Sequence, residues 1–338
     1  MKKRIFYLDF LRSFAMIMVL VLHSISSYIM QPGLFGTKSW YADLFINAFA
    51  RTGVPIFFMI SGSLLLSSDN TENFGRFYKK SLMHIVVPLA FWNVAYFIYK
   101  CIRGYIDFNI IILLSDFINC GSEYHLWYLY TLVGIYLIAP FLKILVNNCS
   151  MRQLIWLLFL MMIGTTIRPF INLVTPLYIY LFEPLFNGYI SCFLMGYILS
   201  KLNYNYKMVI GFLVAGLLGL TGSIVFNYIY SSSEGINLVT NYGYSLCHYV
   251  LATAIFVNSR YALSQKNLFN RIVSVLSKYS FGIYLVHAAV IDMILNYFMI
   301  DASPIVSSIY IFAVTVVVSL LVSIVLGKIK YVRKIIGS

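Results

Sequence analysis

The feature that most constrains this chain is a succession of apolar segments, each about 20 residues long, which is enough for a helix to cross a bilayer. Of the 338 residues, 61% are hydrophobic and only 10% are charged, against roughly 25% charged in soluble globular domains. The sequence therefore predicts an all-α polytopic membrane protein with a single transmembrane domain over residues 1–338. We place ten transmembrane helices at residues 5–27, 42–66, 78–101, 124–146, 153–168, 186–201, 208–230, 242–258, 279–299 and 304–327.

The distribution of basic residues predicts the orientation. Ten helices put both termini on one side, and most of the 24 Lys and Arg residues then fall in the segments on that side. Because loops rich in Lys and Arg stay in the cytoplasm, both termini are predicted to be cytoplasmic. The net charge of +13 then reflects orientation and contact with anionic membrane lipids. Nucleic acid is not expected as a partner, because the basic residues do not cluster on one soluble face.

The first predicted helix, "FYLDFLRSFAMIMVLVLHSIS", contains three ionisable residues: Asp9, Arg12 and His23. Such residues are costly in hydrocarbon and are functional candidates by default. Eleven residues separate Arg12 from His23, so both lie on one helix face, roughly 16 Å apart along the axis. Asp9 precedes Arg12 by three residues and can pair with it. The alternative interpretation is a structural ion pair with a packing histidine.

The second predicted helix contains "ARTGVPIFFMISGSLLL". Arg51 would lie near mid-membrane and needs a partner or water, so we expect it to face a polar cavity shared with Arg12 and His23. Pro55 frees a backbone carbonyl, and Ser61 with Gly62 allows close helix packing.

The remaining histidines differ in their surroundings. His125 opens the fourth predicted helix beside Trp127, at the outer interface, where aromatic anchoring is an alternative to function. His287 lies about halfway along the ninth predicted helix. His248 is interpreted as a packing residue, and His84, near the cytoplasmic interface, carries no functional signal.

These side chains suit group transfer. A buried neutral histidine can take a proton from a hydroxyl near neutral pH, and arginines can hold phosphates or a developing oxyanion. Proton-coupled transport would use the same residue types, so the chemistry alone leaves both open. The five cysteines are scattered without a C-x-x-C pair, so no metal site is predicted.

Four sequence blocks, in order, resemble the acyltransferase-3 family of integral membrane O-acyltransferases, especially the bacterial O-acetyltransferases of enterobacterial common antigen and other surface polysaccharides. The blocks are "DFLRSFAMIMVLVLH", "GVPIFFMISGSLL", "YHLWYLYTLVGIYLIAPFL" and "YSFGIYLVHAAVI". The resemblance implies a protein of the bacterial cytoplasmic (inner) membrane. It also implies acyl-CoA, usually acetyl-CoA, as donor substrate, a sugar hydroxyl on a lipid-linked or surface glycan as acceptor, and no bound cofactor.

Carried onto this sequence, the resemblance matches Arg12 and His23 to the family's first-helix functional pair, with Asp9 preceding them, and His125 and His287 to its later histidines. On this basis we hypothesise the role of each residue. The expected catalytic residues are His23, Arg12 and Asp9, with His23 as general base or acyl relay and Asp9 orienting Arg12. The acyl donor is expected to contact Arg12, Arg51 and Ser61, and the acceptor His125, Trp127 and His287. Two other classes stay open: a transporter or flippase for such a glycan, and a membrane module that binds serine or another metabolite.

Overall fold

The computed structural model describes residues 5–29, 33–175, 188–231, 245–263, 270–330 and 332–336. These residues form helices and their connections, with no strand among them. The helices are α1 Phe6–Ile29, α2 Lys38–Ala50, α3 Gly53–Leu65, α4 Phe74–Phe77, α5 Met83–Ile102, α6 Ile110–Ile118, α7 Trp127–Asn148, α8 Met151–Val174, α9 Gly188–Lys201, α10 Tyr206–Ile229, α11 Leu246–Ala262, α12 Asn270–Tyr297 and α13 Pro304–Lys328. Three short helical segments, η1 Asp69–Thr71, η2 Tyr78–Leu82 and η3 Val332–Lys334, complete the set. The all-α prediction is confirmed for these residues.

Seven helices in the described part of the chain are long and apolar enough to cross a membrane. Three predicted membrane helices fall short of that criterion. In α8 the apolar stretch runs only over Met151–Thr166, and α9 and α11 have 14 and 17 residues. Residues 186–187 and 242–244 of the sixth and eighth predicted helices lie outside the described residues. A multi-pass membrane protein is therefore supported, while the count of ten and the cytoplasmic termini stay predictions.

The second predicted membrane helix is two helices. α2 ends at Ala50 and α3 begins at Gly53, with Arg51 and Thr52 between them. Pro55 explains the break, because it has no N–H to donate to the carbonyl four residues earlier, which belongs to Arg51. The interruption places Arg51 at a helix junction inside a 28-residue apolar segment, Lys38–Leu65.

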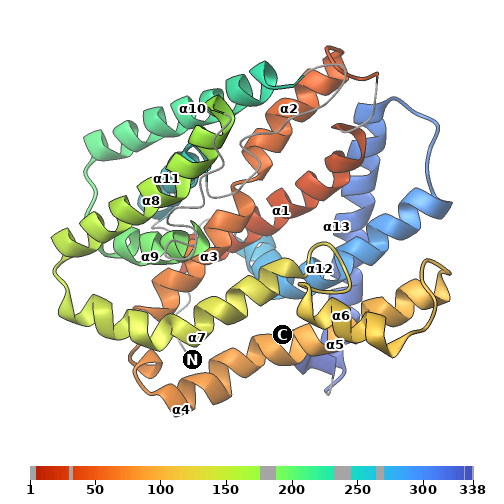
Figure 1. The fold of residues 1–338 in the computed structure, drawn as a ribbon, viewed down its shortest axis with the longest axis horizontal. Coiled ribbons are helices and arrows are strands. Elements are labelled where there is room, and N and C mark those ends of the chain that lie inside the picture. Colours follow the sequence, from red (N-terminus) through yellow and green to blue (C-terminus); the bar gives the residue numbers. More distant parts are fainter. Residues whose placement is uncertain are drawn as a thin grey trace.

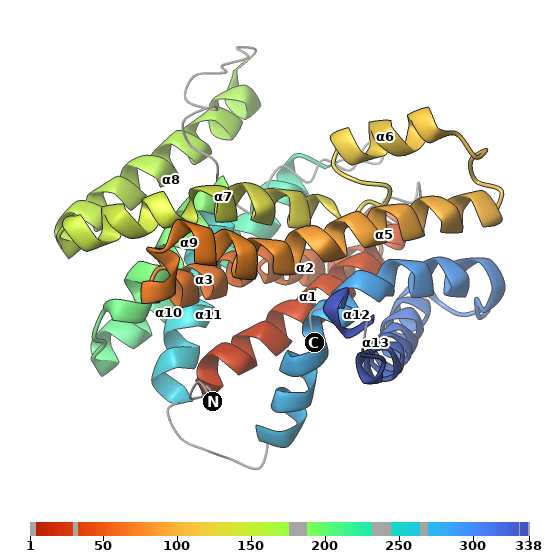
Figure 2. The same ribbon diagram turned by 90° about the horizontal axis from the view of Figure 1, so that it is seen from below.

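α1 occupies the middle of the molecule. It packs against α2, α3, α12 and α13, whereas α10 packs along α11 and α9 lies against both α3 and α8. Figure 1 shows α1 surrounded by these helices, with α8 and α10 on one side and α13 on the other. The view from below in Figure 2 shows α6 set apart above α5. Because α1 is central, its polar residues lie among neighbouring helices.

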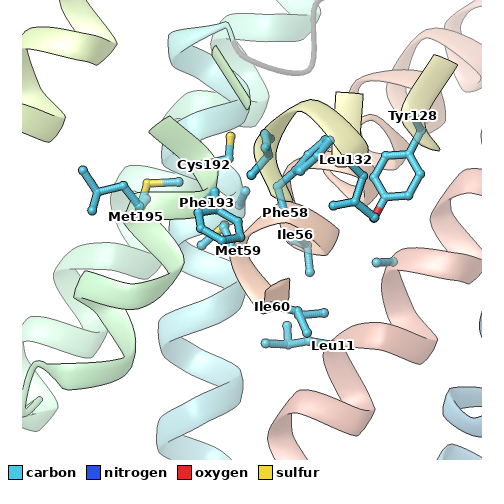
Figure 3. Packing of buried hydrophobic residues seen from close by; sticks show 14 of the residues in the cluster. Leu11, Ile56, Phe58, Met59, Ile60, Tyr128, Leu132, Cys192, Phe193 and Met195 are labelled. Carbon is cyan, nitrogen blue, oxygen red and sulfur yellow. The ribbon is translucent and has the colours of Figure 1, made fainter. Parts of the chain in front are cut away.

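The hydrophobic core joins α1, α3, α7 and α9. Figure 3 shows Phe58 and Met59 of α3 beside Phe193 of α9, and Leu11 of α1 near Ile60. The outer helices, in contrast, expose large apolar side chains. Leu218 on α10, for example, is 69% exposed. Exposed apolar faces of this kind suit contact with lipid chains.

Two glycines set the distance between α3 and α9. A Cβ at Gly62 would lie 1.7 Å from the carbonyl oxygen of Phe193, and one at Gly196 would lie 1.9 Å from that of Met59. The two backbones therefore touch at both positions, as small residues permit between membrane helices.

Candidate active site

Three histidines from distant parts of the chain meet in the structure. The ring centroids of His23 on α1 and His287 on α12 are 5.3 Å apart, and those of His125 and His287 are 4.8 Å apart. His125 lies just before α7. The sequence singled out each of the three separately, and the fold brings them together.

Backbone contacts fix the orientation of the His287 ring. Its Nδ1 lies 2.5 Å from the carbonyl oxygen of Tyr284, which can only accept, so Nδ1 carries the proton. Nε2 therefore has a free lone pair, and it is buried with no hydrogen-bond partner in the described part of the chain. The neutral His287 ring thus presents a proton acceptor to its neighbours.

His125 is held by its backbone while its ring stays open. The Tyr284 hydroxyl donates to the His125 carbonyl oxygen over 2.5 Å, and Tyr96 packs edge-on against the ring with centroids 5.2 Å apart. Neither ring nitrogen has a hydrogen-bond partner among the described residues.

A cavity of about 240 Å³ opens beside His23 and His125. We call it the arginine cavity, because Arg51 lines it together with Trp127, Tyr128 and Tyr189. The Arg51 Nε donates to Asn47 Oδ1 over 2.8 Å, one turn back on α2. Its charge also acts on the ring of His23. A guanidinium, apolar aromatic walls and a histidine make this cavity suited to a polarised carbonyl or an anionic group.

The other end of α1 carries a closed polar network. Arg12 donates from one terminal nitrogen to Asp9 Oδ1 over 3.3 Å and to Ser277 Oγ over 3.2 Å. Ser277 in turn donates to Asp9 Oδ1 over 2.7 Å. The predicted Asp9–Arg12 pair is therefore present, and it ties α1 to α12.

Two tyrosines of α7, Tyr128 and Tyr136, lie within electrostatic range of Arg12. A side-chain hydrogen bond joins Tyr136 to Ser61 of α3. Since Tyr128 lines the arginine cavity as well, α7 connects the Arg12 end of α1 with that cavity.

The predicted site residues therefore fall into two groups. One group surrounds the arginine cavity and the histidines: His23, Arg51, His125, Trp127 and His287. The other lies toward the opposite end of α1: Asp9, Arg12 and Ser61. Trp127 and His125, both expected among the acceptor contacts, line the arginine cavity, and their contact with an acceptor stays a prediction. The sequence predicted one cavity shared by Arg51, Arg12 and His23. In the structure Arg51 and His23 line the arginine cavity, while Arg12 is not among its described lining residues.

Sequence reasoning missed several residues of the site. Tyr284 bridges two histidines, although it stands within the quoted block "YSFGIYLVHAAVI". Ser277 and Tyr189 lie outside all four blocks, and no local pattern marks them. Their roles depend on contacts between helices remote in sequence.

The fold is that of a multi-pass membrane protein with a histidine cluster in its interior. A family model described as an acyltransferase domain matches residues 5–328. The chain therefore belongs to the acyltransferase-3 family.

Two curated relatives, both named amino-acid racemase and both from Enterococcus faecalis, match parts of the chain. The first is 32% identical over 149 residues, which is 42% of this chain and 20% of the relative. The second is 28% identical over 126 residues, 36% of this chain and 16% of the relative. The matched part is thus a fifth or less of each relative's length. No solved structure matches the chain.

Proposed function

We propose that the protein transfers an acyl group, acetyl in the first instance, from cytoplasmic acyl-CoA to a sugar hydroxyl of a lipid-linked or surface glycan, in the bacterial cytoplasmic membrane. The observation that carries the proposal is the meeting of His23, His125 and His287 beside a cavity that contains Arg51. A neutral histidine with a cation beside it supplies the two functions that acyl transfer to a hydroxyl requires: proton removal and charge stabilisation.

In the proposed reaction, His23 acts as general base. It takes the proton of the acceptor hydroxyl while that oxygen attacks the thioester carbonyl. The carbon–sulfur bond breaks, CoA leaves as a thiolate, and the proton held by His23 passes to that sulfur. Arg51, in the same cavity, would stabilise the negative charge that develops on the carbonyl oxygen.

The donor would reach His23 from the Arg12 end of α1. Arg12 would hold the phosphate-bearing part of CoA, since a guanidinium recognises phosphate oxygens in a fork geometry. Asp9 and Ser277 fix the guanidinium by the hydrogen bonds described above. Ser61 and Tyr136 would line the path of the flexible arm, and Trp127 would pack against the acyl end. His287 and His125 would border the acceptor hydroxyl.

The test is a strain lacking the gene, complemented with wild type, with His23→Ala or with His84→Ala. His84 is the matched control, because it is exposed and lies outside the site. Intact-mass spectra of the surface and lipid-linked glycans are compared before and after mild alkali. We expect a base-labile mass increment with wild type and His84→Ala, and at least a 100-fold smaller one with His23→Ala at equal protein level.

Other outcomes decide against parts of the proposal. Retained acylation by His23→Ala would remove His23 from the mechanism. Loss of the glycan from the surface with no base-labile increment would favour a glycan transporter. An unchanged glycan in every strain would move the acceptor to a small metabolite or a lipid.

A further inference from the structure

His23 also lines a second cavity, of about 260 Å³. We call it the tyrosine vestibule, because Tyr99, Tyr105 and Tyr124 line it together with Lys100, Glu123 and Asp292. It lies between the C-terminal ends of α5 and α12, near the end of α1 that is predicted to face outward. None of these six residues was singled out as a site residue by the sequence.

His23 is common to the two cavities. Among the described residues that line the arginine cavity and the tyrosine vestibule, it is the one that appears in both. An acyl transfer brings two substrates to one proton acceptor from different directions. The arginine cavity contains the cation suited to the thioester, so the tyrosine vestibule is left for the second substrate.

Charges in the tyrosine vestibule are paired. Lys100 Nζ lies 3.4 Å from Glu123 Oε2, and Arg103 Nε lies 3.5 Å from Asp292 Oδ2. An anionic ligand would need a cation that is not already neutralised by a carboxylate. The vestibule therefore suits a ligand without net charge.

Asp292 organises the tyrosine hydroxyls. Tyr99 donates to its Oδ2 over 2.5 Å, and Tyr105 donates to its Oδ1 over 3.1 Å. Asn296 Nδ2 also donates to Oδ1 over 3.1 Å. The Tyr105 hydroxyl also accepts from Arg103 Nη2 over 2.9 Å and from Asn296 Nδ2 over 3.1 Å, so it is held in place by both neighbours. The Tyr99 hydroxyl, which donates to the carboxylate, can use its lone pairs to accept from hydroxyl groups of a ligand.

The vestibule also offers aromatic surface. Tyr105 and Tyr124 are 48% and 50% exposed, while the Tyr124 ring packs against His23 with centroids 4.9 Å apart. Asp292 follows His287 by five residues, so it lies about 7.5 Å further along α12. Rings flanked by fixed polar groups form a pocket typical of an amphipathic small molecule.

We propose that the tyrosine vestibule binds the acyl acceptor and that it selects an uncharged, hydroxyl-rich ring. Such a ligand is a neutral sugar unit and not an acidic one. The inference rests on the proposed function, since it takes His23 as the point of transfer. Asp292 acts as a positioning residue, which sets the hydroxyls of Tyr99 and Tyr105.

The experiment uses the full chain with Tyr105→Ala and Asp292→Asn. Tyr41→Ala is the matched control, because Tyr41 is also 48% exposed but lies on α2, outside the vestibule. Two quantities are measured: the base-labile increment on the glycan in complemented cells, and equilibrium binding of radiolabelled acetyl-CoA to the purified protein. We expect the base-labile increment to be reduced by about tenfold or more in both vestibule variants, while their binding of acetyl-CoA equals that of wild type. Tyr41→Ala should match wild type in both.

The outcomes separate this inference from the proposed function. No base-labile increment with wild type overturns the proposed function and the inference with it. Wild-type acylation by both vestibule variants overturns the inference alone, as does a parallel loss of acetyl-CoA binding. Fragment mass spectra of the modified glycan test the ligand class: a base-labile group on a neutral sugar unit supports it, and one on an acidic unit contradicts it.

Discussion

The two ends of α1 show polar residues used in two different ways. Around Arg12, the side chains of Asp9, Arg12 and Ser277 hydrogen-bond to one another and join two helices. Around His23, the neighbouring rings of His125 and His287 are buried with ring nitrogens that have no partner in the described part of the chain. Buried polar atoms are normally satisfied, so exceptions point to a functional use. We infer that the Arg12 end is built to hold a substrate and the His23 end to react with it.

The largest expected effect comes from moving α3, which begins beside Arg51 and contains Ser61, so it reaches both ends of α1. Gly62→Ala would place a Cβ 1.7 Å from the Phe193 carbonyl oxygen, so α3 and α9 must separate. We expect about 3 kcal/mol or more of destabilisation, beyond ordinary overpacking, because backbone has to move. Thermal unfolding in detergent, followed by size-exclusion chromatography, measures this.

The control for that change is Gly134→Ala on α7, where a new Cβ meets nothing within 4 Å. It should leave the unfolding temperature unchanged. Equal stability of Gly62→Ala and wild type would mean that the two helices are not in backbone contact.

The next effect concerns the His23 end. His287→Phe keeps an aromatic ring beside His23 but removes the Nε2 lone pair. We expect the rate of glycan acylation to fall about 100-fold, with binding of acetyl-CoA unchanged, because the acceptor hydroxyl would lose the lone pair that positions it for His23 and misplacement can cost roughly this much. Initial rates and equilibrium donor binding are the measurements. A wild-type rate would reduce His287 to a packing residue.

The smallest expected effect concerns the Arg12 end. Arg12→Lys keeps the charge but loses the planar guanidinium. A lysine ammonium therefore cannot hold Asp9 and Ser277 and also bind a phosphate in the same geometry. We expect the KM for acyl-CoA to rise about tenfold, or roughly 1.4 kcal/mol, with a smaller change in kcat. Arg76→Lys, on the exposed α4, should be silent. A fall in kcat alone would assign Arg12 to the chemical step.

Local patterns in the sequence were sufficient for much of the fold. Apolar segments predicted the long helices, and the three-residue spacing of Asp9 and Arg12 predicted their ion pair. The same patterns missed α6, whose run "IIILLSDFI" is too short to span a membrane but forms a helix with Ile111 71% exposed. They also predicted a single helix where the structure has α2 and α3, because a proline such as Pro55 shows that a helix can break but not that it does.

The sequence by itself determined the long apolar helices and the shared face of Arg12 and His23, since apolar composition and the repeat of a single helix are both local properties. Only the tertiary structure decided that His125 and His287 join His23, that Ser277 completes the Arg12 network, and that two cavities meet at His23. These groups come from helices separated by more than a hundred residues. Their approach depends on packing, such as the glycine contacts of α3 with α9, which no local pattern encodes.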